Sequence, residues 1–267
     1  MNRSLVLFAA ALGLSIGGSA MAASVGLSFV GGGTPGGGTL TASDVAGAPG
    51  YAQANWNNLL TDWSGDGTND ALFASGLKDS NGNTVAFGVG YAPGASDPIH
   101  YDAANVWGTG IANTTANNRL MRGYLDSNDG NSASQPFVEI KGIPYGKYDV
   151  VVYADGDVTN GQLGQYWLEA FNSTLLTSKV YINDVGNFGG TFVEAVPSTI
   201  QGSGGTGNYF VFRGLTATEF RLRGDQGNGT RSPINAFQIV QVVPEPATAS
   251  LALLGLGGLM MRRRRMA

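Results

Sequence analysis

Short runs of β-branched and aromatic residues follow one another from position 83 to 242, with clusters of Gly, Asn, Ser and Asp between them. Within several runs apolar and polar residues alternate, and this period of two places them on opposite faces of a strand. In the run from Phe220 to Arg223, the two apolar residues face one way and the two arginines the other. The pattern predicts about ten strands, near positions 83–91, 119–125, 137–140, 147–154, 165–171, 174–182, 190–196, 208–213, 218–223 and 234–242.

Many short strands separated by turn-rich spacers are typical of an antiparallel β-sandwich or jelly roll. One short helix is expected ahead of them, because two tryptophans and two leucines have the spacing of one helical face: Trp56, Leu59, Leu60 and Trp63. The chain has no cysteine, so a packed core and not disulfides must stabilise it. We therefore predict one all-β domain, residues 23–243, with a single short helix.

The first 22 residues have the pattern of a secretory signal peptide. Arg3 provides a short positive region, an apolar stretch runs from Leu5 to Ile16, and Ala20 and Ala22 form an A-x-A cleavage site. The alternative is an N-terminal membrane helix, which the small residues after Ile16 and the cleavage site disfavour. This segment predicts that the protein is exported.

The last 24 residues, 244–267, consist of three parts in a fixed order. A stiff acidic turn, Pro244-Glu245-Pro246, is followed by a charge-free apolar run and then by four arginines: Arg262, Arg263, Arg264 and Arg265. The run from 247 to 261 is shorter than the roughly 20 residues that a single membrane span needs. It therefore favours a transient membrane segment over a permanent one, with the arginines on the cytoplasmic side.

This arrangement resembles the PEP-CTERM sorting signal of Gram-negative bacteria. The resemblance implies that an exosortase, a membrane protease-transpeptidase, recognises Pro244, Glu245 and Pro246, and that the arginine block acts as the stop. It also implies that secretion machinery exports the protein, and that sorting delivers it to the cell surface, the outer membrane or the extracellular matrix. A plain C-terminal membrane anchor is the alternative interpretation.

Several short sequence segments in the rest of the chain, here called phrases, also occur together in a known class of domain: 55–59, 120–126, 138–144, 148–153 and 233–240. In these phrases the chain resembles the β-rich body of many PEP-CTERM proteins of planctomycetes and verrucomicrobia. The phrases at 148–153 and 233–240 are also similar to those of galactose-binding-like jelly rolls. The resemblance implies a fold and no particular activity.

Residues that carry catalytic chemistry are few. Without cysteine, and with His100 as the one histidine, the chain offers neither a thiol nucleophile nor a histidine zinc site. Paired carboxylates of a glycoside hydrolase remain an alternative. However, the glutamates ahead of the tail lie in predicted strands, where acids normally face water: Glu139, Glu169, Glu194 and Glu219. We therefore expect no catalytic residues and no enzyme activity.

Three residues are candidates for ligand binding: Trp107, Asp155 and Asp157. Asp155-Gly156-Asp157 is an oxygen-rich loop that can hold a structural calcium ion, although a solvated turn is the favoured interpretation. Trp107 lies in a loop-like segment, where its ring is free to stack on a sugar. Trp167 lies in an alternating run, so we expect it in the core.

The charge distribution argues against nucleic acid as a partner. Five of the 15 basic residues are arginines near the two ends of the chain, so the segment between them is strongly acidic. The leading hypothesis is an exported, non-enzymatic surface or matrix protein with a structural or adhesive role. The alternative is a carbohydrate-binding module that recognises an extracellular polysaccharide, and a secreted glycoside hydrolase comes third.

Overall fold

The computed structural model describes thirteen strands and one short helix within residues 23–30, 38–60, 72–86, 88–91, 106–125, 136–156, 163–184, 186–225 and 231–243. The signal peptide and the sorting signal expected from the sequence lie outside these residues. Among the helices in this part of the chain, none is long and apolar enough to cross a membrane.

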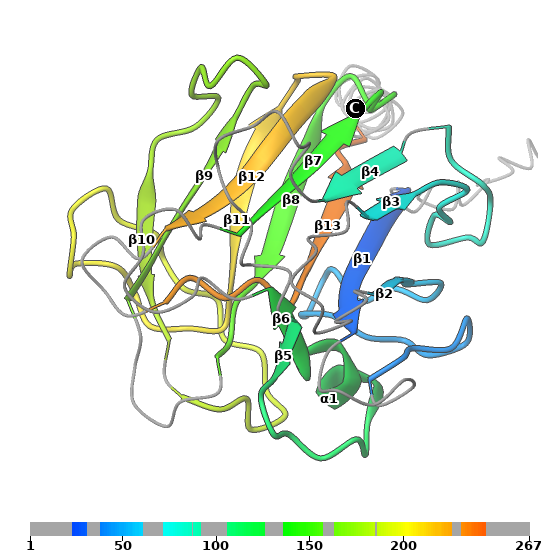
Figure 1. Ribbon diagram of the computed structural model, residues 1–267, viewed down its shortest axis with the longest axis horizontal. Helices are drawn as coiled ribbons and strands as arrows, with labels where there is room; N and C mark the ends of the chain where they lie inside the picture. The colour runs from blue at the N-terminus through cyan, green and yellow to red at the C-terminus, as the bar shows by residue number, and fades with distance from the viewer. Residues whose placement is uncertain are drawn as a thin grey trace, which may run out of the picture.

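Two sheets lie face to face and form a sandwich (Figure 1). The first sheet has the order β11 (Tyr209–Leu215), β8 (Tyr148–Tyr153), β13 (Ala236–Gln241), β1 (Ser24–Val30) and β2 (Asn57–Leu60). The second has the order β10 (Val180–Asn183), β9 (Leu163–Glu169), β12 (Glu219–Asp225), β7 (Phe137–Lys141), β4 (Gly88–Tyr91) and β3 (Leu72–Ala74). All neighbouring strands are antiparallel except β1 and β2.

A two-stranded ribbon lies beside the sandwich, and the helix precedes its second strand. The ribbon pairs β5 (Val106–Gly108) with β6 (Gly123–Leu125), and α1 (Ala116–Leu120) comes just before β6. Thr115 caps the helix, because its side chain accepts a hydrogen bond from the backbone N–H of Asn118 at 3.1 Å. The chain thus forms a β-sandwich with one short helix, as predicted, although the helix is not at the predicted position.

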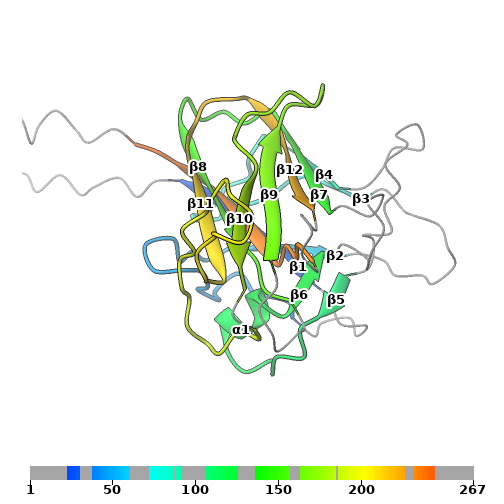
Figure 2. The ribbon, with the colours of Figure 1, turned by 90° about the vertical axis from the view of Figure 1, so that its left-hand side faces the viewer.

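The main hydrophobic core lies between the two sheets. Tyr148, Val150 and Val152 of β8 share one face of the strand and are fully buried in this core. Across from them the second sheet contributes Val138, Ile140, Tyr166, Leu168, Phe220 and Leu222. Figure 2 shows β8 and β11 on one side of this interface and β9, β12 and β7 on the other.

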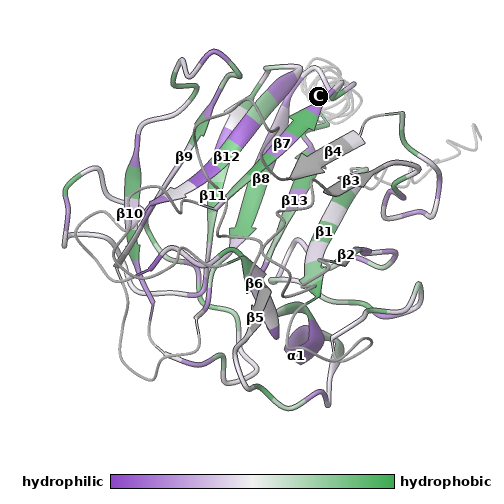
Figure 3. Cartoon of the chain, in the orientation of Figure 1, coloured by the Kyte–Doolittle hydropathy of each residue, from purple (hydrophilic) through white to green (hydrophobic). Residues whose placement is uncertain are grey.

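A second hydrophobic cluster covers the outer face of the first sheet. Val151 and Tyr153 of β8 belong to it, and so do residues of the 38–56 segment, of α1 and of the segment after β10: Leu40, Ala46, Ala48, Trp56, Leu120, Met121 and Phe188. Strand β8 is therefore buried on both faces, which explains its nearly continuous apolar sequence (Figure 3).

The helix predicted over residues 56–63 is wrong where the structure describes it, up to residue 60; Trp63 lies outside the described residues. Residues 57–60 form β2, which pairs in parallel with β1. Asn57 holds the strand in place, because its amide donates to the carbonyls of Gly26 and Lys78 at 2.9 Å each and its oxygen accepts from the N–H of Lys78. Asn58 exchanges two hydrogen bonds with the backbone of Leu40 in the same way. These amides act as extra backbone partners that a helix would not provide.

The other strand predictions have mixed outcomes. Strands are confirmed near 137–140, 147–154, 165–171, 208–213, 218–223 and 234–242, and the predictions at 83–91 and 174–182 are too long. The prediction at 119–125 is confirmed for 123–125, which form β6, and wrong at its start, which lies in α1. The prediction at 190–196 is wrong, because that segment contains only a single bridge, from Glu194 to Tyr209. Strands β1, β3 and β5 were not predicted.

We predict that Tyr153→Phe lowers the free energy of unfolding by about 2 kcal/mol, because two buried polar groups lose their partner. The Tyr153 hydroxyl donates to the amide oxygen of Gln238 at 2.6 Å and accepts from the N–H of Ala48 at 3.0 Å. Urea denaturation measures the change. Tyr209→Phe is the control, since that hydroxyl lies 3.4 Å from Glu194 at the edge of the fold; an equal loss in both variants would contradict the prediction.

Candidate functional site

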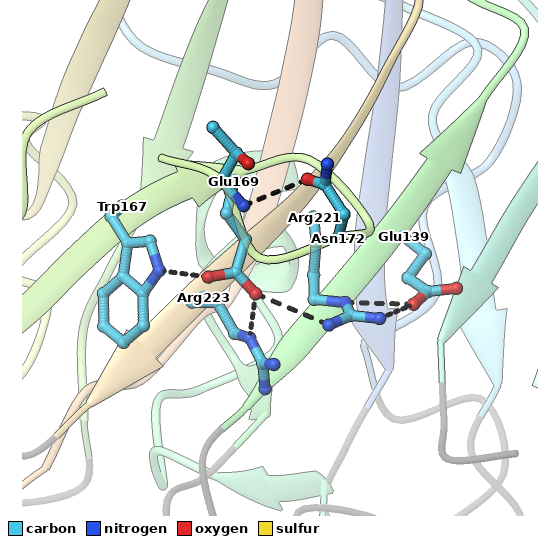
Figure 4. Close-up of polar contacts among 7 residues, drawn as sticks. Glu139, Trp167, Glu169, Asn172, Arg221 and Arg223 are labelled. Carbon is cyan, nitrogen blue, oxygen red and sulfur yellow. Dashed lines mark hydrogen bonds and ion pairs between the residues drawn. The ribbon is translucent and has the colours of Figure 1, made fainter. Parts of the chain in front are cut away.

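Charged and aromatic side chains gather on the face of the second sheet that points away from the main core. Strand β12 provides Arg221 and Arg223, because its alternation turns Phe220 and Leu222 into the core. The antiparallel register places Arg221 opposite both Glu139 of β7 and Glu169 of β9, and Arg223 opposite Trp167 and Phe137. We call Phe137, Glu139, Trp167, Glu169, Arg221 and Arg223 the arginine cluster; Figure 4 labels all of them except Phe137.

Two carboxylates neutralise the two guanidinium groups. Arg221 binds the Oε1 atom of Glu139 through Nε at 3.0 Å and Nη2 at 2.5 Å, and its Nη1 lies 3.4 Å from Oε1 of Glu169. Arg223 donates from Nε to the same oxygen of Glu169 at 2.8 Å. The indole N–H of Trp167 donates to the other oxygen of Glu169, also at 2.8 Å. Glu169 therefore connects three side chains (Figure 4).

These charges are largely withdrawn from water. Arg223 is 4% exposed, Glu169 5% and Arg221 7%. At such burial an ionised group is stable only with a partner, and loss of one partner typically costs about 3–5 kcal/mol. Burial alone would raise the pKa of Glu169, but the bonds from Trp167 and Arg223 and the charges of both arginines hold that pKa below its ordinary value.

Cations occupy the faces of the aromatic rings at this site. The guanidinium carbons of Arg221 and Arg223 both lie 5.0 Å from the centre of the Phe137 ring. The ammonium group of Lys179 lies 3.9 Å from the centre of the Trp167 ring. Trp167 is buried, as expected, yet it belongs to neither hydrophobic cluster. The arginine cluster is therefore a polar layer in which cationic side chains pack against the faces of aromatic rings.

One donor of the arginine cluster is unused. Within the described residues, Nη1 of Arg223 is buried and has no hydrogen-bond acceptor. A guanidinium group has five N–H donors, and a planar fork of this kind suits hydroxyl or carboxylate oxygens. Nε of Arg223 donates to Glu169, and Nε and Nη2 of Arg221 donate to Glu139.

The expectation that strand glutamates face water is wrong for Glu169, which is buried among the arginines. Sequence reasoning missed this because the partners are 52 and 54 residues away along the chain. Alternation does separate Arg221 and Arg223 from the core side of β12, but no local signal shows that they are buried. Glu219 is exposed, and Glu194 forms an ion pair with Arg213 at 2.8 Å.

The candidate ligand-binding residues from the sequence are not brought together. Asp155 is fully buried, so the solvated-turn interpretation is wrong for it. Asp157 lies outside the described residues, and so do the cleavage residues Ala20 and Ala22. Trp107 lies in β5, but its side chain is not among those described. The unexpected neighbour of Asp155 is Asp184, whose charge acts on the Asp155 carboxyl group.

The arginine cluster has the chemistry of a structural ion network. A general acid for glycoside hydrolysis needs a raised pKa, whereas that of Glu169 is lowered by the groups that contact it. Glu139 faces the same arginine, Arg221. Both carboxylates are thus already engaged by cations of the chain itself.

Comparison with known proteins identifies the C-terminal segment. Residues 242–265 match the PEP-CTERM protein-sorting motif. This confirms the sorting signal expected from Pro244, Glu245, Pro246 and the arginines that follow the apolar run. The motif implies an exported protein whose C-terminus is associated with the membrane and processed by an exosortase. The match concerns this motif alone, so the resemblance of the rest of the chain to planctomycete and verrucomicrobial domains stays a prediction.

One solved structure has limited similarity to the body of the chain. It is the isomalto-dextranase of Arthrobacter globiformis T6 complexed with panose, with 13% sequence identity and a TM-score of 0.29. The alignment covers 58% of this chain and 22% of the enzyme. A likeness of this size supports no conclusion about substrate or activity. The chain matches none of the curated protein sequences with which it was compared.

We predict that Glu169→Gln lowers the free energy of unfolding by about 3–5 kcal/mol at pH 7, because it leaves two buried arginines without their shared carboxylate. The pKa of Glu169 is lowered in the folded state, so its contribution is present above the ordinary glutamate pKa of about 4.3 and disappears as pH falls below it. Denaturant titrations of both proteins from pH 7 to pH 3 measure the difference.

Glu139→Gln is the matched control, because the side chain of Glu139 is 25% exposed and water can replace part of its interaction. Its loss should be about 1 kcal/mol. A stability difference between parent and Glu169→Gln that does not shrink toward pH 3 would contradict the electrostatic explanation.

Proposed function

We propose that this protein is an exported, non-enzymatic component of the cell surface or the extracellular matrix, with a structural or adhesive role. The observation that carries the proposal is the PEP-CTERM protein-sorting motif at residues 242–265, directly after the last strand of a packed sandwich. The motif accounts for delivery, and the sandwich provides a stable body that does not depend on disulfides.

The absence of an enzymatic role is part of the proposal. Three of the glutamates that a glycoside hydrolase would use are in ion pairs with arginines: Glu139, Glu169 and Glu194. For Glu169, burial raises the pKa, but the bonds from Trp167 and Arg223 and the charges of both arginines hold it below its ordinary value, so this carboxyl group cannot act as a general acid at neutral pH. A hydrolase would instead need a carboxyl group with a raised pKa next to bound sugar.

We expect Glu245→Ala to block processing of the C-terminus in cells that contain the sorting protease, because the acidic residue of the recognition motif is lost. The parent should then have a truncated C-terminus and the variant an intact tail retained in the membrane fraction. Mass spectrometry of the mature C-terminus and cell fractionation measure both. Glu219→Ala, an exposed acid on β12, should be processed like the parent; identical processing of Glu245→Ala would refute this sorting route.

A second candidate function is recognition of an extracellular polysaccharide. The observation in its favour is that Nη1 of Arg223 has no acceptor within the described residues, in a guanidinium group over the ring of Phe137 and opposite Trp167. Guanidinium and aromatic groups are frequent in sugar-binding sites, and a sugar would have to displace the groups that bury this donor. Trp107 of β5, the tryptophan that the sequence favours for stacking, is the other candidate anchor. Binding through Arg223 and binding through Trp107 predict different effects of mutation.

A glycan array with full-length protein distinguishes these possibilities. If a polysaccharide binds through the guanidinium fork, Arg223→Lys should weaken binding at least tenfold, because lysine keeps the charge but not the planar donors. If binding depends on stacking at position 107, Trp107→Ala should abolish it and Trp107→Phe should keep most of it. No binding of the parent to any glycan would eliminate this second candidate and leave the structural role.

A further inference from the structure

Two aspartates from different sheets meet at one end of the sandwich. Asp155 follows β8 of the first sheet and Asp184 follows β10 of the second (Figure 1). Asp155 is 0% exposed and Asp184 3%. The backbone N–H of Asp155 donates to the side-chain oxygen of Asn235 at 2.6 Å, which fixes the end of β8 against the residue that precedes β13. We call Asp155 and Asp184 the aspartate pair.

Backbone N–H groups donate hydrogen bonds to some, but not all, of the carboxylate oxygens of this pair. Oδ2 of Asp155 accepts from the N–H of Phe188 at 3.0 Å. Oδ2 of Asp184 accepts from Gly156 and its Oδ1 from Gly186, both at 3.2 Å. Within the described residues, Oδ1 of Asp155 is buried without any hydrogen-bond partner. A carboxylate oxygen in this state is costly unless a proton or a cation reaches it.

The electrostatics of the pair favour the uptake of either a proton or a cation. Burial, and then the charge of Asp184, raise the pKa of Asp155 to about 8. Among the residues that the structure describes, neither lysine nor arginine acts on Asp155, in contrast to the glutamates of the arginine cluster. Two buried carboxyl groups in contact can therefore share one proton, or they can bind a cation.

We propose that the aspartate pair binds one hard divalent cation, calcium in the extracellular setting, and that this ion fastens the segment after β10 to the end of β8. The available ligands are oxygens, which suit calcium and not the transition metals that prefer nitrogen or sulfur. Two carboxylates balance the charge of the ion, and the free Oδ1 of Asp155 is a ready ligand.

The affinity should be moderate. The described residues bring no third acidic side chain or histidine to the pair, so neutral oxygens from backbone carbonyls and water complete the coordination shell. Extracellular calcium modules with few charged ligands bind with dissociation constants of about 0.1–1 mM. Calcium accepts such mixed and irregular ligand sets, whereas magnesium requires a near-ideal octahedron and retains its water.

The ion would act on the second hydrophobic cluster. Phe188, whose N–H binds Asp155, packs against Phe192 with ring centres 4.8 Å apart, and Phe192 packs against Tyr153 of β8 at 5.3 Å. Fixing Asp155 and Asp184 to one cation therefore also fixes the aromatic residues that cover the outer face of the first sheet. Sequence analysis pointed to Asp155 but not to its partner, which lies 29 positions further along the chain.

Thermal unfolding of the full chain at pH 8 tests the proposal. After removal of metal with EDTA, 10 mM CaCl₂ should raise the melting temperature of the parent by roughly 3–10 °C. The increase should disappear in Asp155→Asn and in Asp184→Asn. Asp79→Asn is the matched control, because Asp79 is also buried but accepts hydrogen bonds from N–H groups of Asn81 and Asn83 in its own turn; it should retain the calcium response.

The metal-free proteins provide the second measurement. Because the pKa of Asp155 is raised in the folded state, the metal-free parent should lose stability as pH rises from about 4 toward 8. Asp155→Asn removes a buried charge and should be at least as stable as the metal-free parent at pH 8. A parent whose melting temperature rises on acidification but does not respond to calcium would hold a proton only, and the proposal would be overturned.

Equilibrium dialysis with radioactive calcium decides independently of the variants: one bound ion per chain supports the site, and none overturns it.

Discussion

Strand β8 is buried on both faces, and the remaining elements are arranged around that burial. One face packs into the core between the sheets, and the other is covered by the 38–56 segment, α1 and the segment after β10. Its sequence, Tyr148–Tyr153, has a single charged residue, Asp149, which accepts a hydrogen bond from Gly214. A strand covered on one side would tolerate polar residues at every second position. Because β8 is covered on both faces, polar groups in the elements that pack on it are buried as well, and each needs a hydrogen-bond partner.

Three clusters of buried polar groups show how far such groups find hydrogen-bond or charge partners in this fold. At the first, the Tyr153 hydroxyl and the Gln238 amide form a network with Ala48, Tyr51 and Gln53 that ties the covering segment to the sheet. At the second, the arginine cluster pairs each carboxylate with a guanidinium. Within the described residues both the arginine cluster and the aspartate pair have a buried atom without a partner, Nη1 of Arg223 and Oδ1 of Asp155. The aspartate pair differs because its two groups have charges of the same sign. A buried pair of like charges is the feature for which an external ligand gives the most direct physical explanation.

The sequence predicted elements with strong alternation and failed where long-range partners decide the structure. The orientation of Arg221 and Arg223 follows from β12 alone, but their burial depends on Glu169, which is remote in the sequence. The helical spacing of Trp56, Leu59 and Leu60 is equally compatible with a strand whose asparagines bind neighbouring backbones. Asp184 gave no signal, because nothing within its own segment shows that β10 ends beside β8. Local sequence patterns thus constrain the face of the strand on which a side chain lies, and tertiary contacts decide whether it is buried and which residues it contacts.

The antiparallel pair of β1 and β13 links the fold to export. Ser24 is opposite Val240, and the N–H of Gln241 donates to the carbonyl of Ala23 at 2.9 Å. The segment predicted to be cleaved after Ala22 and the matched motif that begins at residue 242 therefore adjoin the folded body at the same end of one strand pair. Asn235, which contacts Asp155, precedes β13 at its opposite end. Six strand residues separate the two ends by roughly 20 Å, so processing of the tail and ion binding at the aspartate pair would act at opposite ends of the sandwich.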